Sequence, residues 1–114
     1  MEIQIEGALE RPVPRGHVTT RMRQVLGRLP VRPVKARVTF SDVNGPKGGN
    51  DVRCTVQVEL PHQSPMHVER VALTPRLAFD ASYDRVVRRI EGYRERAQDS
   101  RRRPKKYYAA KRLL

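Results

Sequence analysis

The sequence VTFSDVNGPKGGNDVRC, residues 38–54, decides the fold of this chain, because it joins two alternating segments through a glycine-rich loop. Apolar residues occupy every second position on both sides of the loop, at Val38, Phe40, Val52, Cys54, Val56, Val58 and Leu60. A period of two places one side of a strand against a core and the other side in water. The segment therefore predicts two consecutive strands, each with one buried side.

The loop between these strands, residues 44–50, contains Lys47 and no acidic residue. Its glycines permit positive φ and Pro46 fixes φ, which is the usual chemistry of turns. A hairpin needs only about two loop residues, so this longer loop favours contact with a partner, with Lys47 and backbone N–H groups presented to a phosphate. A loop that is merely long is the alternative. The pattern is not typical of nucleotide-binding loops, because it lacks a GK[ST] ending and precedes a strand.

The rest of the chain extends this pattern into a complete domain. Strands are expected at residues 2–6, 34–42, 51–60 and 66–73, and amphipathic helices at residues 15–29 and 75–100. Thr74 and Pro75 have the chemistry of an N-cap and a first helical position. Polar residues alternate with the apolar ones in the strands, so two helices would cover only one face of the sheet. We expect an α+β fold: a two-layer βαβββα sandwich with a four-stranded sheet and two helices on one face.

Charge divides the chain into two parts. We expect one domain, residues 1–100, followed by a basic tail, residues 101–114, that is disordered when free. The net charge is +12, and the last 14 residues contain no acidic residue. Such an excess of positive charge favours a polyanion as partner, most often nucleic acid. Arginine outnumbers lysine, and its planar guanidinium group suits phosphate binding and base stacking.

Helical geometry of about 100° per residue sorts most charges of the second helix by side of the apolar stripe, with Arg88 between the two sets. The basic flank holds Arg85, Arg89 and Arg96, and the acidic flank holds Asp80, Asp84, Glu91 and Glu95. The first helix has an equivalent basic flank. We expect the two helices to present one basic track that binds RNA; ordinary solvated helix faces are the alternative. The candidate RNA-binding residues of the helices are Arg21, Arg28, Arg85, Arg88, Arg89 and Arg96. Those of the tail are Arg101, Arg102, Arg103, Lys105 and Lys106.

Gly92 lies on the arginine side of the second helix, although glycine costs a helix interior about 1 kcal/mol relative to alanine. One explanation is the close approach of a phosphate backbone at this position. The other explanation is packing against a neighbouring strand. The sequence leaves both explanations open.

Several functional classes are disfavoured by what the chain lacks. Its single cysteine, Cys54, excludes an internal disulfide, fits a reducing compartment and alternates with core residues. The three histidines have no metal-ligand spacing, and no catalytic constellation is present. We therefore expect no metal, no cofactor, no small-molecule substrate and no enzymatic activity. No apolar run approaches about 18 residues and the N-terminus is unlike a signal peptide, which predicts a cytoplasmic protein without a membrane partner.

Two segments resemble a known family. FSDVNGPKGGNDVRC, residues 40–54, and AFDASYDRVVRRI, residues 78–90, are similar to motifs of the ribosome hibernation-promoting factor and ribosome-associated translation inhibitor family. The resemblance covers residues 1–101. It implies the same βαβββα fold and binding to rRNA of the small ribosomal subunit, across the decoding region where mRNA and tRNA lie. Occupying that channel would block translation.

The resemblance also assigns roles to residues. It carries the RNA-binding role to Lys47 and to four arginines of the second helix, and less firmly to Arg21 and Arg28. The arginines of the second helix are Arg85, Arg88, Arg89 and Arg96. Longer members have a second domain that pairs ribosomes, whereas this chain resembles a short form and is expected to be a monomer when free. The alternative function is a regulatory adaptor that binds a protein partner and modulates transcription.

Overall fold

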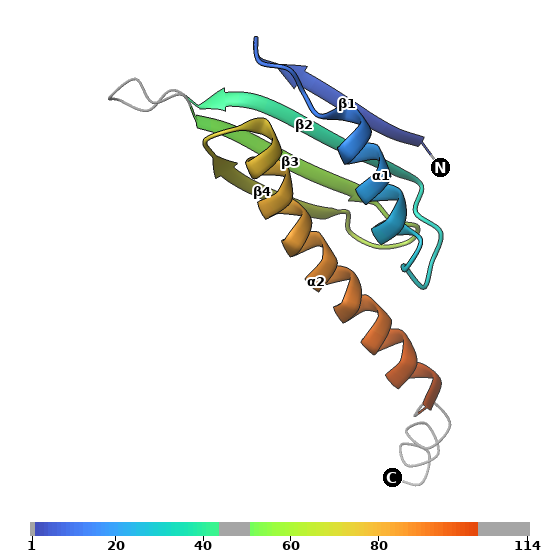
Figure 1. The fold of residues 1–114 in the computed structure, drawn as a ribbon. Helices are drawn as coiled ribbons and strands as arrows, with labels where there is room; N and C mark the ends of the chain where they lie inside the picture. The colour runs from blue at the N-terminus through green and yellow to red at the C-terminus, as the bar shows by residue number, and fades with distance from the viewer. Residues whose placement is uncertain (1, 44–50, 103–114) are drawn as a thin grey trace, which may run out of the picture.

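The computed structural model describes residues 2–43 and 51–102, and it confirms the predicted order of elements (Figure 1). The elements are β1 (Glu2–Ala8), α1 (Arg15–Leu26), β2 (Lys35–Val43), β3 (Asp51–Glu59), β4 (Met66–Ala72) and α2 (Pro75–Arg102). Both helices lie on one face of the sheet, with α1 over β1 and β2 and α2 over β3 and β4 (Figure 1). The fold is the expected two-layer α+β sandwich.

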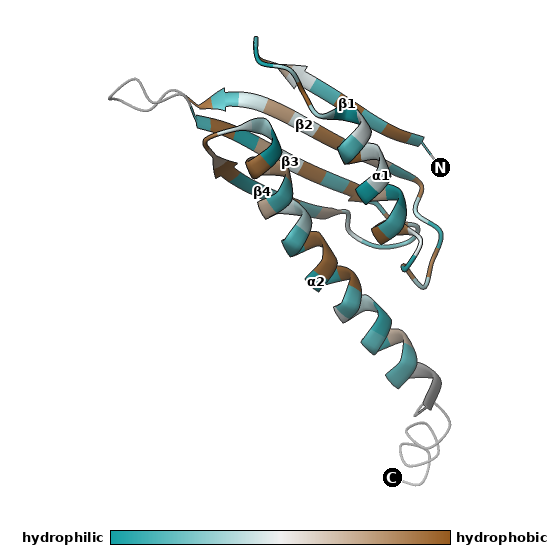
Figure 2. Cartoon of the chain, in the orientation of Figure 1, coloured by the Kyte–Doolittle hydropathy of each residue, from teal (hydrophilic) through white to brown (hydrophobic). Residues whose placement is uncertain are grey.

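The sheet is mixed. Its strand order is β1-β2-β3-β4, with β1 parallel to β2 and the other neighbours antiparallel. The register pairs Val38 with Val56 and Phe40 with Cys54, so the apolar residues flanking the glycine-rich loop stand on the same face. Figure 2 shows the resulting alternation of hydrophobic and hydrophilic positions along the strands.

The core lies between that face and the helices. The predicted inward residues of β2 and β3 are all buried, and so are Val18, Met22, Val25 and Leu26 of α1. α2 contributes Phe79, Val86 and Ile90, together with two small residues, Ala78 and Ser82. Buried apolar surface of this kind is the main source of folding stability.

Ser82 shows why two small residues occupy the core side of α2. Its hydroxyl donates to the carbonyl oxygen of Cys54, at 3.1 Å, and to the carbonyl oxygen of Ala78, at 3.0 Å. The first of these acceptors belongs to β3, so the short side chain joins the helix directly to the sheet. A larger residue at either position would force the two elements apart.

The ends of the elements differ slightly from the prediction. α1 ends at Leu26, not at residue 29, because the backbone N–H groups of Arg28 and Leu29 bond three residues back, in a tighter turn, before Pro30. α2 begins as predicted, with the backbone N–H of Leu77 3.1 Å from Oγ1 of Thr74. It continues to Arg102, two residues into the segment assigned to the tail.

α2 is long compared with the sheet. Its 28 residues span about 42 Å at 1.5 Å per residue, whereas the nine residues of β2 span about 30 Å. Its C-terminal part therefore projects beyond the sheet, and this part is mostly hydrophilic (Figures 1 and 2).

Candidate nucleic-acid interface

The predicted arginines of α2 lie at its surface. Arg85, Arg88, Arg89 and Arg96 are all exposed. Within the described ranges, no carboxylate lies within ion-pair distance of any of them. Their guanidinium groups therefore keep hydrogen-bond donors that are available to an anion. We call these four residues the arginine flank.

Two contacts show which way the arginine flank faces. Nη1 of Arg89 donates a hydrogen bond to the backbone carbonyl of His67 in β4, at 3.0 Å. Cζ of Arg96 lies 4.7 Å from the ring centroid of Tyr93 on the same helix. The first contact places Arg89 on the β4 side of α2, away from α1, whereas Arg96, farther along the helix, lies beside the turn that follows α1.

The acidic flank of α2 faces α1. Nε2 of His17 lies 2.7 Å from Oδ1 of Asp80, and the His17 ring meets Phe79 edge-on at 5.6 Å. Farther along α1, Cζ of Arg21 lies 5.8 Å from the ring centroid of Tyr83. The basic flank of α1 therefore packs beside the acidic flank of α2.

This arrangement corrects one expectation. The two helices do not present one continuous basic track, because the basic flank of α1 meets acidic and aromatic residues of α2. Arg21 lies at the contact between the helices, and Arg28 is exposed in the turn after α1. Arg89 lies on the other side of α2, against β4. The RNA-binding roles of all these residues remain predictions.

The other predicted basic residues lie at or beyond the ends of the described segments. Arg101 and Arg102 belong to the last turn of α2. Lys47, Arg103, Lys105 and Lys106 lie outside the described residues. In the sequence Lys47 falls between β2 and β3; β2 ends and β3 begins at the end of the sheet opposite the projecting part of α2 (Figure 1).

Gly92 has open space around it. A Cβ atom at this position would meet the Nη1 atom of Arg96 at 3.5 Å and no strand. Packing against a neighbouring strand therefore does not explain this glycine. The other explanation, close approach of a phosphate backbone, stays a prediction.

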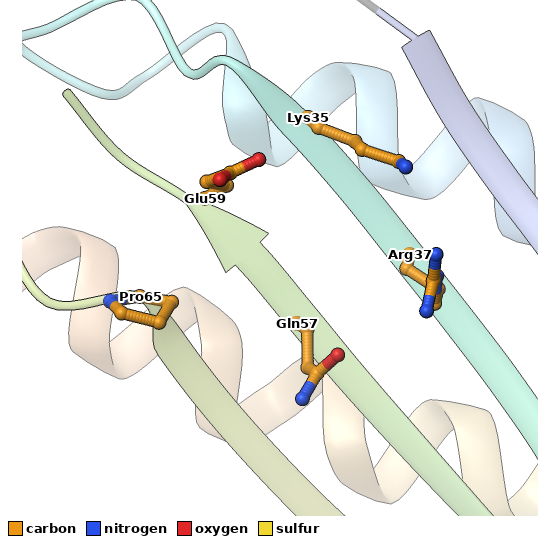
Figure 3. Close-up of a pocket in the computed structure, with 5 residues that line it drawn as sticks. All are labelled: Lys35, Arg37, Gln57, Glu59 and Pro65. Atoms are coloured by element: carbon orange, nitrogen blue, oxygen red, sulfur yellow. The ribbon is translucent and has the colours of Figure 1, made fainter.

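The open face of the sheet has a different character. Its hollow, about 250 Å³ in volume, is lined by Lys35, Arg37, Gln57, Glu59 and Pro65 (Figure 3). Basic residues on this face pair with acidic ones: Arg53 lies 2.7 Å from Glu69 and Arg37 lies 3.8 Å from Glu6. Mixed and partly neutralised charge makes this face a weaker candidate for binding a polyanion than the arginine flank.

The cysteine in the core is chemically unreactive. Cys54 is buried, and desolvation raises the pKa of its thiol from 9.0 to about 12 despite a hydrogen bond with Ser82. A neutral thiol is a poor nucleophile and a poor metal ligand. No group of three or more potential metal-ligating side chains was found in the described part of the chain. Among the described helices, none is long and apolar enough to cross a membrane.

Comparison with known proteins supports the fold. No protein-family model and no curated protein sequence matches this chain. Solved structures do match it, among them the two that follow. A ribosomal subunit interface protein from Coxiella burnetii is 16% identical, with a TM-score of 0.60 over 83% of this chain and 99% of that chain. The N-terminal domain of Thermus thermophilus Protein Y is 23% identical, with a TM-score of 0.65 over 82% and 99%. At these identities the likeness shows a shared fold.

Proposed function

We propose that this chain is a member of the ribosome hibernation-promoting factor family, which binds rRNA of the small ribosomal subunit and blocks translation. Three observations support the proposal. The fold is shared with a ribosomal subunit interface protein, the sequences of the glycine-rich loop and α2 resemble the family's motifs, and the arginine flank is exposed without carboxylate partners among the described residues.

The arginine flank is the observation that carries the proposal. Arg85 and Arg88 lie about one turn apart on one helix, and Arg96 lies about two turns beyond Arg88, so their spacing is fixed before a ligand arrives. A guanidinium group binds phosphate with two parallel hydrogen bonds. Each phosphate that is neutralised releases condensed counterions, which makes the affinity large and dependent on salt.

The mechanism is occupancy of a channel. A body with a four-stranded sheet and a helix of about 42 Å would fill the space in which mRNA and tRNA bind, and it would do so without covalent chemistry. Folded rRNA is recognised by its shape and its phosphates, so the protein needs no reading of base sequence. Such a role places the protein in the cytoplasm, as a monomer when free.

Co-sedimentation with purified small ribosomal subunits tests the proposal. We compare two variants that each lose three positive charges: Arg85→Gln/Arg88→Gln/Arg96→Gln on the arginine flank, and Lys35→Gln/Arg37→Gln/Arg53→Gln on the open sheet face. Arg89 is left intact because it also bonds to β4. The proposal expects the first variant to be released from the subunits and the second to stay bound. Equal release, or unchanged binding of the first variant, would contradict it.

The same assay distinguishes the proposed function from the alternative one. A regulatory adaptor would form a complex with an acidic protein that is insensitive to salt, and it would not pellet with ribosomal subunits. Rising salt should instead dissociate the complex that we propose.

A further inference from the structure

Two adjoining hollows lie at the end of the sheet where α2 projects. The first, about 590 Å³ in volume, lies between the turn after α1, the turn between β3 and β4, and α2. The second, about 380 Å³, lies beside the C-terminal end of α1. Pro30 and Val31 line both hollows, so the two are neighbours at the turn after α1.

Charge distinguishes this pair from the hollow on the open sheet face. Arg96 lines the first hollow, and Arg23 and Arg32 line the second. Among the described residues, no carboxylate lines either of these two hollows, whereas Glu59 lines the hollow on the sheet face. The surface of this pair is therefore complementary to a ligand that carries negative charge.

The remaining lining suits a flat ring. Tyr93 has the Arg96 guanidinium 4.7 Å from its ring centroid, and Val31, which is 38% exposed, adds an apolar wall. Unpaired RNA bases stack on aromatic rings and on guanidinium planes. Gln63 and Ser64 line the same hollow, and their side chains carry donors and acceptors that the edge of a base can use.

We propose that the two hollows together bind single-stranded RNA. An unstacked base lies against Tyr93, Arg96 and Val31, and the phosphates of the neighbouring nucleotides lie on Arg23 and Arg32. The proposal rests on the proposed function for the nature of the partner, and it adds a second RNA contact that is separate from Arg85, Arg88 and Arg89. An acidic peptide would satisfy the arginines but would leave the ring-stacking surface unused.

A fluorescent oligoribonucleotide tests this site directly. The probe is a single strand of about ten nucleotides with one 2-aminopurine base, whose fluorescence falls when it stacks. Tyr93→Leu keeps apolar bulk against the core but removes the ring, so we expect affinity to fall about tenfold and the quenching to disappear. Tyr93→Phe should retain both. Thermal unfolding of each variant checks that the fold is intact.

The phosphate contacts have their own readout. Arg23→Gln/Arg32→Gln should reduce the salt dependence of probe binding, by about 0.7 in the log–log slope for each lost contact. The matched control, Arg37→Gln/Arg53→Gln on the open sheet face, should leave that slope unchanged. Equal changes in the two variants would show that net charge alone decides binding, and would overturn the site.

Two further outcomes separate this inference from the proposed function. If folded Tyr93→Leu binds and quenches the probe like the unchanged protein, the hollows are not an RNA site, even if the protein still pellets with small ribosomal subunits. If the probe binds as expected but the protein does not pellet, the site stands and the ribosomal function fails. Binding of labelled polyglutamate that depends on Arg23 and Arg32, without quenching of the RNA probe, would also overturn the RNA assignment.

Discussion

Arg89 of α2 donates a hydrogen bond from Nη1 to the backbone carbonyl of His67, at 3.0 Å, on the edge strand β4. Beside it, Nη1 of Arg70 lies 2.7 Å from the carbonyl of Glu69 on the same strand. Edge strands present unpaired backbone groups to which another chain can add. These two guanidinium groups occupy acceptors of β4 and so protect the edge, which gives Arg89 a structural role beside its predicted contact with RNA.

Replacing Arg89 with alanine should therefore affect stability and association. We expect the free energy of unfolding to fall by at most about 1 kcal/mol, because the hydrogen bond is exposed, and self-association to increase through the freed edge. Urea denaturation and analytical ultracentrifugation measure the two effects. Arg85→Ala is the matched control, with no such contact to β4; a variant of Arg89 that stays monomeric at high concentration would show that the edge needs no protection from it.

The contact between the helices can be tested at His17. His17→Ala removes the hydrogen bond to Asp80 and the edge-on contact with Phe79, so we expect a loss of about 1–2 kcal/mol in the free energy of unfolding. Asp80→Asn keeps the ring contact and should cost less. Chemical denaturation at constant pH gives both values. Equal losses in the two variants would mean that the ring contact contributes nothing.

Gly92→Ala should stabilise the protein and weaken its binding to the small subunit. Alanine is favoured over glycine in a helix by about 0.5–1 kcal/mol, and an added Cβ meets only Arg96, at ordinary contact distance. If a phosphate backbone approaches this position, the methyl group should lower affinity several-fold in the co-sedimentation assay. Gly16→Ala in α1, where a Cβ meets nothing within 4 Å, is the control that should stabilise without weakening binding.

Cys54 predicts a loss of stability at high pH. The unfolded thiol ionises near 9.0 and the folded thiol near 12, so above pH 9 the unfolded state releases a proton that the folded state keeps. The stabilisation of the folded state by the protonated thiol of Cys54 is fully present below pH 9. It is lost as pH rises toward 12, at about 1.4 kcal/mol of unfolding free energy per pH unit. Cys54→Val removes this dependence, so the difference between the two proteins in urea denaturation should change with pH above 9. A constant difference would refute the shift.

Salt should control the proposed complex with the small ribosomal subunit. If about six phosphates are contacted, affinity should fall by about 10³ or more between about 50 and 200 mM salt. Replacing Arg85, Arg88 and Arg96 with neutral residues should reduce the slope of log affinity against log salt concentration. Each replacement should remove the part of the slope that one phosphate contact contributes. Titration by fluorescence anisotropy at several salt concentrations measures the slope, and a flat dependence would favour recognition of a protein surface instead.

Much of the fold could be predicted, because the signals are local. The alternation around Val38 and Val56 determines which side of each strand is buried, and the chemistry of Thr74 marks the start of α2. Ala78 and Ser82 were missed because they lie at the margin of the apolar stripe, where small residues carry little hydrophobic signal. Their role depends on how closely α2 approaches β3, which no local pattern encodes.

The candidate site was predicted less completely. A helical wheel gives the angle between Arg89 and Asp80 but not which neighbour each one meets, so the packing of His17 on Asp80 was not foreseen. Arg23 and Arg32 were missed for another reason. They line a hollow built by the irregular turn after α1, where sequence periodicity carries no information about neighbours.

The length of α2 has a consequence for recognition. It is a single helix from Pro75 to Arg102, which begins near the end of the sheet where β2 ends and β3 begins and ends beyond the opposite end of the sheet (Figure 1). A rigid rod of this kind fixes the spacing between contacts at its two extremities, so a suitable receptor must offer anionic groups at matching separations. Deleting two turns from the projecting part, about 11 Å, would leave the terminal side chains on nearly the same side of the helix but bring them closer to its N-terminal end. They would then no longer reach the matching anionic groups of the receptor, so the length of the helix selects receptors of one size.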